Sequence, residues 1–267
     1  MEEVAEELAG ADERVRPVKS AARTIELLEF LARTRGKRSL ADIHETLRYP
    51  KSSLYVLLQT LIQLGWVDTD PTGTLYGLGA RALLVGTAYL DGDEMVKLAA
   101  DALDRLAHNT TETVHLARLD RTDVVYLATR ESEHYLRPFS RVGRRLPAHA
   151  TSLGKALLAE RTDDSIRALL PERLAALTER TCTSREALLE ELARTRRRGY
   201  SAERDENTVG LACFGAALRT REPTTDAISC SIPVARLNPA RSRSIVAALL
   251  AARDEIEAAV RGLIHEF

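Results

Sequence analysis

"SLADIHETLRYPKSSLYVLLQTLIQLGW" (Ser39–Trp66) contains two segments with helically spaced apolar residues, separated by only a few residues. Ser39 and Asp42 form a capping-box pattern at the start of the first segment, in which each side chain bonds the backbone amide of the other residue. Pro50 ends that segment, because a residue that precedes proline avoids the right-handed helical region. The second segment then begins at Pro50 or Lys51. Two helices joined by so short a turn predict a helix-turn-helix.

The second helix opens with Lys51 and two serines rather than with an acid, although a helix N-terminus favours negative charge. Such an end is suited to meet an external anion such as a phosphate. At 100° per residue the leucines cluster on one side of this helix, which leaves Gln59 and Val56 opposite. Gln59 can pair with adenine and Val56 can contact a thymine methyl group. We therefore expect a recognition helix whose DNA-binding residues are Lys51, Ser52, Ser53, Tyr55, Val56 and Gln59.

The flanking segments extend this motif to a winged helix-turn-helix over residues 18–78. Apolar residues recur with helical spacing from Val18 onward, and two short strand-like runs flank a turn at residues 70–73. Residues 18–80 carry eight basic and six acidic side chains, a net charge of +2, whereas the whole chain has a net charge of −1. This mild asymmetry is compatible with DNA binding but does not require it. A helical bundle, or a helix-turn-helix that contacts other proteins, remains an alternative.

The rest of the chain predicts an α+β organisation. Residues 1–17 form an acidic tail that we expect to be disordered or frayed, and residues 79–94 form a linker helix. Residues 95–267 begin with a helix and continue with strand-like runs, then helices, then strands again. The run "HYLRPFSRV" (134–142) is predicted as a strand. Further helix starts are expected at a capping box formed by Thr183 and Glu186, and at Asn238, which precedes Pro239.

Composition excludes several other classes of protein. No basic segment precedes an apolar run, so no signal peptide is expected, and the longest apolar stretch is too short to span a bilayer. The three cysteines, Cys182, Cys213 and Cys230, are an odd number at wide spacing, which fits neither a disulfide framework nor a zinc motif. We expect a cytoplasmic protein with no metal and no cofactor.

Two patterns raise the possibility of catalysis or nucleotide binding. Cys213 with His115 or His149 could form a nucleophilic pair, although nothing local marks this cysteine as activated. "GLGARA" (77–82) fits the glycine fingerprint of dinucleotide sites, but no second parallel strand follows at the required distance. We therefore expect no enzyme activity. A metabolic enzyme built on the C-terminal domain remains the alternative function.

Several motifs in a fixed order carry a resemblance to a known family. From residue 18 to the C-terminus the chain resembles IclR-type bacterial transcriptional regulators. The segments that carry this resemblance are "VKSAARTIELLEFLA", "SLADIHETL", "PKSSLYVLLQTLIQLGWV", "YGLGARALLVGTAYL", "LPAHATSLGKALLA", "GYSAERDENTVGLACFGAALR" and "AISCSIP". Their order and spacing are far more specific than any one of them.

The resemblance implies a winged-helix domain, a linker helix and a GAF-like effector-binding domain with a mostly antiparallel sheet. It implies homodimers or homotetramers on a palindromic double-stranded DNA operator, controlled by a small organic metabolite that is a carboxylate or an aromatic compound. The residues it assigns to effector binding are Thr151, Ser152, Leu153, Glu203, Cys213, Ser229 and Ser231. A helix N-terminus at Ser152 could offer its amides to a ligand carboxylate.

This sequence departs from the family pattern at three positions. Val56 and Gly77 stand where relatives often carry arginine, and Glu203 is one methylene longer than the aspartate that is common there. The first two changes remove cations from the expected DNA face, and the third should reshape the effector pocket. The sequence thus predicts an effector-responsive DNA-binding transcriptional regulator.

Overall fold

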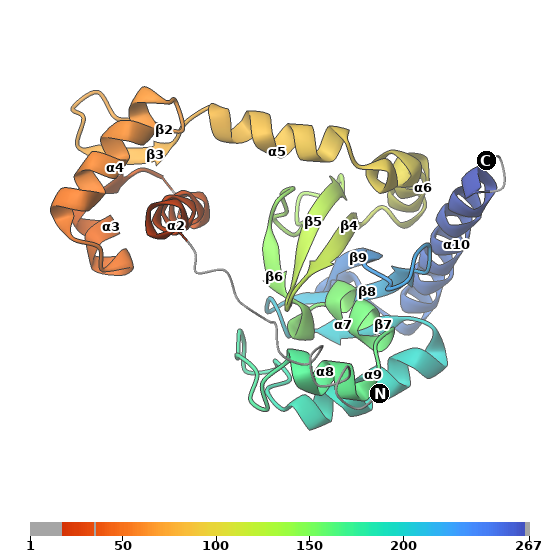
Figure 1. Cartoon of the computed structure of the whole chain (residues 1–267). Helices are drawn as coiled ribbons and strands as arrows, with labels where there is room; N and C mark the ends of the chain where they lie inside the picture. Colours follow the sequence, from red (N-terminus) through yellow and green to blue (C-terminus); the bar gives the residue numbers. More distant parts are fainter. Residues whose placement is uncertain (1–17, 35, 265–267) are drawn as a thin grey trace, which may run out of the picture. The chain divides into compact units, whose positions relative to one another are not determined.

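The computed structural model describes residues 18–34 and 36–264, which divide into two compact units at Tyr89/Leu90 (Figure 1). The acidic tail predicted for residues 1–17 lies outside the described residues. Helix α5, which covers most of the predicted linker, crosses the division. The elements up to and including this helix are α2 (Lys19–Arg33), β1 (Arg38–Ser39), α3 (Leu40–Leu47), α4 (Lys51–Gln63), β2 (Val67–Thr69), β3 (Leu75–Leu78) and α5 (Arg81–Asp91).

Three helices of the N-terminal unit pack around one small apolar core. Leu27 of α2, Ile43 of α3 and Leu58 of α4 are completely buried in it. The predicted capping box starts α3: the Ser39 hydroxyl accepts from the Asp42 amide at 3.2 Å, and the Asp42 carboxylate accepts from the Ser39 amide at 3.1 Å. The helix-turn-helix predicted from the apolar spacing is therefore confirmed.

A three-stranded antiparallel sheet in the order β1-β3-β2 forms the wing. Its tip is closed by Asp70, whose Oδ1 accepts from the amides of Thr74 at 2.9 Å and Leu75 at 2.8 Å. Gly73 adopts a φ of +72° in this turn, a conformation that favours glycine. The predicted hairpin is therefore present.

The C-terminal unit is built on a six-stranded sheet in the order β6-β5-β4-β9-β8-β7, in which every pairing is antiparallel. Its elements are α6 (Glu94–Thr110), β4 (Thr113–Asp120), β5 (Asp123–Arg130), β6 (Arg145–Pro147), η1 (Ala148–Ala150), α7 (Ser152–Ala159), α8 (Asp163–Leu169), α9 (Arg185–Arg198), β7 (Ser201–Arg204), β8 (Leu211–Leu218), β9 (Asp226–Pro233), η2 (Val234–Arg236) and α10 (Pro239–Ile264).

Helices cover both faces of this sheet (Figure 1). Alternate strand residues such as Leu116, Ile228 and Cys230 point to one face, where they pack against α6 and α10. The intervening residues point to the other face, where Ala117 and Ala227 pack against α7, α8 and α9. The predicted α+β fold is confirmed, and no helix of the described residues is long and apolar enough to cross a membrane.

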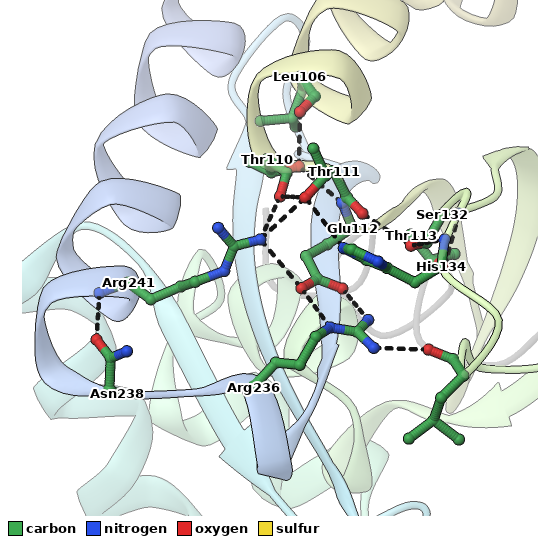
Figure 2. A network of polar contacts seen from close by, with 11 residues as sticks. Leu106, Thr110, Thr111, Glu112, Thr113, Ser132, His134, Arg236, Asn238 and Arg241 are labelled. Atoms are coloured by element: carbon green, nitrogen blue, oxygen red, sulfur yellow. Dashed lines mark hydrogen bonds and ion pairs between the residues drawn. The ribbon is translucent and has the colours of Figure 1, made fainter.

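A buried carboxylate joins the start of β4 to the two C-terminal helical elements (Figure 2). Glu112 is completely buried and binds Arg236 through two contacts, Nε–Oε1 at 3.0 Å and Nη2–Oε2 at 2.5 Å. Arg241 of α10 reaches the same carboxylate at 3.2 Å and the carbonyl of Thr110 at 2.7 Å. These contacts fix the α6–β4 junction against α10. The side-chain oxygen of Asn238 accepts a hydrogen bond from the amide of Arg241 at 2.9 Å and so caps α10, as predicted from Asn238-Pro239.

Two local predictions are wrong. Residues 134–142 form a loop rather than a strand, because the apolar side chains of the segment, such as Tyr135 and Phe139, are exposed instead of packing on one face. Helix α9 is capped by Ser184, whose hydroxyl accepts from the Ala187 amide at 3.4 Å, and not by Thr183. The backbone of Thr183 is instead hydrogen-bonded to the segment before it, because the Thr183 carbonyl accepts from the Leu174 amide at 2.9 Å.

Candidate functional site

All six predicted DNA-binding residues lie on α4, and most of them are exposed. Tyr55 is 50% exposed and Val56 is 63% exposed, whereas Leu54 and Leu58 on the opposite side are buried. Gln59 is half-buried beside Val56. The side of α4 that points away from the core therefore carries small and polar side chains together with one valine. We call the exposed side formed by Ser52, Tyr55, Val56 and Gln59 the recognition face.

The N-terminus of α4 is open to solvent. Arg48 ends α3 with a φ of +57°, and Pro50 then precedes α4 with a φ of −54°. Among the described residues no side chain caps the first amides of α4, and its first turn contains no acid. The exposed Lys51 ammonium adds positive charge to the positive end of the helix dipole. This end can bind an anion.

Gly77 lies in the wing strand β3, where relatives of the resembled family often carry arginine. A Cβ atom at this position would lie 3.0 Å from Cγ of Lys37. The Lys37 ammonium donates a hydrogen bond to the carbonyl of Thr69, on the neighbouring strand. The aliphatic side chain of a lysine from a different segment therefore occupies the space over Gly77, and its ammonium lies at the neighbouring strand, a placement that the sequence did not indicate.

The predicted effector residues from β7, β8 and β9 lie side by side on one face of the sheet. The strand register places Glu203 opposite Cys213, and Cys213 opposite Ser231. The Cys213 thiol and the Ser231 hydroxyl lie 3.3 Å apart. Two residues further along, on the same face, Ser229 lies opposite His115. We call this set, Glu203, Cys213, Ser231, Ser229 and His115, the polar row.

Close backbone packing brings the start of α7 against the polar row. Thr151 caps the helix by accepting from the Gly154 amide at 3.0 Å. The Ser152 carbonyl accepts from the Ser201 hydroxyl of β7 at 2.5 Å, and a Cβ atom on Gly215 of β8 would lie 2.6 Å from that carbonyl. The amides of Ser152 and Leu153 are the first two of α7 and have no acceptor within the helix. The structure thus brings together all seven predicted residues, which come from distant segments.

Burial favours the uncharged forms of the titratable groups in the polar row. Burial raises the pKa of Glu203 to about 7, although hydrogen bonds from Cys213 and Glu206 oppose this shift. Burial also raises the pKa of the Cys213 thiol well above its ordinary value, and the neighbouring Glu203 carboxylate adds to the effect. For His115, burial and then the charge of Arg144 lower the pKa to about 3. The row therefore offers hydrogen bonds without a fixed negative charge at mildly acidic pH.

These values argue against a catalytic cysteine. A nucleophilic cysteine needs a lowered pKa or an adjacent base, whereas Cys213 has a raised pKa. Neither predicted histidine is hydrogen-bonded to the Cys213 thiol as a base would be. Nε2 of His115 binds the Ser140 hydroxyl at 2.8 Å, and Nε2 of His149 lies 2.9 Å from the carbonyl of Ala175. Within residues 18–34 and 36–264, no three histidine, cysteine or acidic side chains are grouped so as to hold a metal ion.

A buried ion cluster contacts the polar row through Glu203. Lys155 of α7 is completely buried, and its Nζ lies 2.9 Å from Oε2 of Glu191 and also contacts the carboxylate of Glu206. The amide of Glu206 donates to Oε2 of Glu203 at 3.0 Å. This cluster was not predicted from the sequence, and neither were the places of His115, Ser140 and Ser201 in the site. Only His115 has a local signal in the sequence, because it is a titratable residue directly between the apolar residues Val114 and Leu116.

The chain matches known proteins along most of its length. A model described as the bacterial transcriptional regulator IclR C-terminal domain matches residues 87–258, and the IclR helix-turn-helix domain model matches residues 20–71. The chain is 32% identical over 251 residues to the transcriptional repressor IclR of Escherichia coli K12. The aligned region covers 92% of this chain and 91% of that protein. It is also 32% identical over 252 residues to the regulator KdgR of the same organism, with coverages of 94% and 95%.

A solved structure has the same fold. The crystal structure of an IclR transcriptional regulator from Alicyclobacillus acidocaldarius matches with a TM-score of 0.81 and 23% identity, over 92% of this chain and 100% of that chain. Both units therefore have a counterpart of known architecture.

Proposed function

Because this chain belongs to the IclR family of bacterial transcriptional regulators, we propose that it reads a palindromic operator as a homodimer and responds to a small carboxylate. The family membership makes the chain a DNA-binding regulator with a C-terminal effector-binding domain, and not an enzyme. The operator symmetry, the dimer, the class of effector and the residues that bind each partner are the parts we propose. A regulator of this kind acts on DNA in the cytoplasm.

The recognition face of α4 is the observation that carries the DNA part of the proposal. Three of its four residues are exposed and Gln59 is half-buried, whereas the other side of the helix forms part of the core of the unit. Ser52 and Gln59 would contact base edges, Val56 would contact a thymine methyl group, and Tyr55 would lie at the flank. Lys51 and the free amides at the start of α4 would bind a backbone phosphate.

Helix α5 supports the dimer. None of its residues is buried within the described chain, and several of its exposed side chains are apolar. Leu83 is 70% exposed and Leu84 is 68% exposed. Val85 and Tyr89 are also more than half exposed. Apolar side chains in such a group are usually covered by another protein surface. We propose that a second copy of this chain covers them, because a two-fold dimer is what reads a palindrome.

The polar row and the start of α7 support the effector part. The ligand carboxylate would accept hydrogen bonds from the amides of Ser152 and Leu153, which lie at the positive end of the helix dipole. Other ligand oxygens would bond the hydroxyls of Ser229 and Ser231, while Thr151, Glu203 and Cys213 complete the site. The protonated form of Glu203 favours an anionic ligand, because a charged carboxylate there would repel it.

The DNA part is tested by fluorescence anisotropy with the full chain and a labelled duplex at several salt concentrations. The duplex is one that the wild-type chain recovers from a random library. Lys51→Gln should flatten the log–log salt dependence by about 0.9 for each phosphate that the variant no longer neutralises. The matched control is Lys97→Gln, an exposed lysine on α6 of the other unit. Equal slopes for wild type and Lys51→Gln would contradict the proposed role of Lys51.

The effector part is tested by thermal shift with pairs of ligands that differ only in the carboxylate: benzoate with benzamide, and pyruvate with pyruvamide. A carboxylate at 100 times its Kd should stabilise the fold by about 2.7 kcal/mol, and its amide partner should stabilise it much less. The proposal fails if amides match their carboxylates, or if no carboxylate raises the melting temperature.

A further inference from the structure

A hollow of about 490 Å³ lies between α2 and α4 on the surface of the N-terminal unit. Its lining includes one guanidinium and several hydroxyl groups, and it is shared with the recognition face through Ser52 and Val56. The polar residues that line it are Ser20, Arg23, Ser52, Ser53 and Thr60. Within the part of the chain that the structure describes, the hydroxyls of Ser20, Ser52 and Ser53 make no side-chain hydrogen bond, so they are available to a ligand.

Arg23 is held in the hollow by an aromatic ring rather than by an acid. Its guanidinium carbon lies 4.8 Å from the centroid of the Tyr49 ring. The Tyr49 hydroxyl donates to the carboxylate of Glu26, which ties this ring to α2. Among residues 18–34 and 36–264 no carboxylate forms an ion pair with Arg23. Stacking of this kind orients a guanidinium while its N–H donors remain available at the edge.

The position of the hollow relative to the recognition face suggests what fills it. At 100° per residue, Leu54 and Leu58 define the core side of α4, whereas Ser53 and Thr60 lie on the flank towards α2. An α-helix is about 10–12 Å wide and the major groove is about 12 Å wide, so the helix fills the groove from wall to wall. The sugar–phosphate backbone would therefore run along the flanks of the helix. The hollow lies on one of these flanks, the one that faces α2.

We infer that the hollow binds a backbone phosphate of the operator, with Arg23 as the cation and the hydroxyls of Ser20 and Ser53 as further donors. This inference rests on the proposed function, in which α4 enters the major groove. Tyr49 is a positioning residue, because it holds Arg23 and does not touch the DNA. The contact carries no base information, so it strengthens binding to all sequences alike.

The test is the Arg23→Gln variant of the full chain, measured by fluorescence anisotropy on a selected duplex and on an unrelated duplex over a range of KCl concentrations. Both affinities should fall by a similar factor, about tenfold or more, because a hydrogen bond to a charged group is removed. The log–log salt slope should become shallower by about 0.9 per phosphate, with an unchanged ratio between the two duplexes. Arg23→Lys keeps the charge and should retain most of the slope.

The matched control is Arg33→Gln. Arg33 lies at the other end of α2, is 71% exposed and pairs with Glu29 at 2.8 Å, so its replacement should leave the slope unchanged. An unaltered slope in Arg23→Gln, while Lys51→Gln still flattens it, would overturn the phosphate assignment and leave the proposed function intact. If neither variant alters the slope, both the phosphate assignment and the proposed approach of α4 to DNA are wrong.

Discussion

Nε of Arg118 lies 2.7 Å from Oδ1 of Asp226, its register partner on the neighbouring strand β9. The same guanidinium contacts the carboxylate of Asp93, which caps α6 by accepting from the amides of Met95 at 3.0 Å and Val96 at 3.3 Å. Asp226 is completely buried. One arginine therefore joins the first turn of α6, directly after the α5 helix, to the middle of the sheet.

Replacing Arg118 with methionine should destabilise the C-terminal unit. The change leaves the buried carboxylate of Asp226 with Arg221 as its remaining cationic partner among the described residues, so we expect a loss of about 3 kcal/mol in the free energy of unfolding. Urea denaturation followed by circular dichroism measures this loss. Arg105→Met removes an exposed ion pair with Glu255 and should cost less than about 1 kcal/mol. Equal losses in the two variants would show that the ion pairs of Arg118 contribute little.

Glu203→Gln should change how stability depends on pH. The folded protein binds a proton on Glu203 up to about pH 7, whereas the unfolded chain releases it near the ordinary glutamate pKa of 4.5. Wild-type stability contributed by this group is therefore present below pH 4.5 and is lost as the pH rises to 7. The glutamine variant lacks this loss, so it should gain about 3 kcal/mol relative to wild type across that interval and remain level above it. A constant difference between the two proteins over the same interval would refute the raised pKa.

Ser231→Ala should weaken effector binding and leave DNA binding without effector unchanged. Its hydroxyl, 3.3 Å from the Cys213 thiol, is a proposed donor to the ligand. Removal of one hydrogen bond corresponds to about 0.5–1.5 kcal/mol, which is about two- to tenfold in Kd. Isothermal titration with the carboxylate that stabilises the wild type most measures this. Ser244→Ala, an exposed serine on α10, is the control. If both variants bind alike, Ser231 lies outside the effector site.

Val56→Arg should change base preference at one position of each half-site. The valine is at the centre of the recognition face, where an arginine could bond the O6 and N7 atoms of guanine in place of a thymine methyl contact. Selection from a randomised library, run at one salt concentration on the variant and the wild type, measures the preference. Ser244→Arg adds the same charge on α10 of the other unit and should leave the preference as it is. No change for Val56→Arg would mean that α4 is rotated relative to our assignment.

Local signals made much of this fold predictable from the sequence. The Ser39–Asp42 capping box and the Asn238-Pro239 helix start depend on residues close together in the chain, and the structure has both. The predicted strand at 134–142 is absent because β5 pairs instead with the short strand β6 that follows this segment. Its apolar residues Tyr135 and Phe139 are exposed instead.

The candidate site was predictable only through the family motifs. Register between distant strands decides that His115 meets Ser229 and that Cys213 meets Ser231, and no local pattern encodes such pairings. For the same reason the partners of Lys155 were not foreseen. The departure at Gly77 illustrates the limit well: the sequence shows a missing arginine, whereas the structure shows Lys37 lying over the glycine.

The central claim is that two copies of this chain read a symmetric operator with α4, and selection of duplexes by the full chain from a randomised library tests it most directly. We predict enrichment of an inverted repeat whose half-sites are separated centre to centre by about 10.5 base pairs or a multiple of that spacing. Enrichment of a single unrepeated site, or of no sequence at all, would contradict the account.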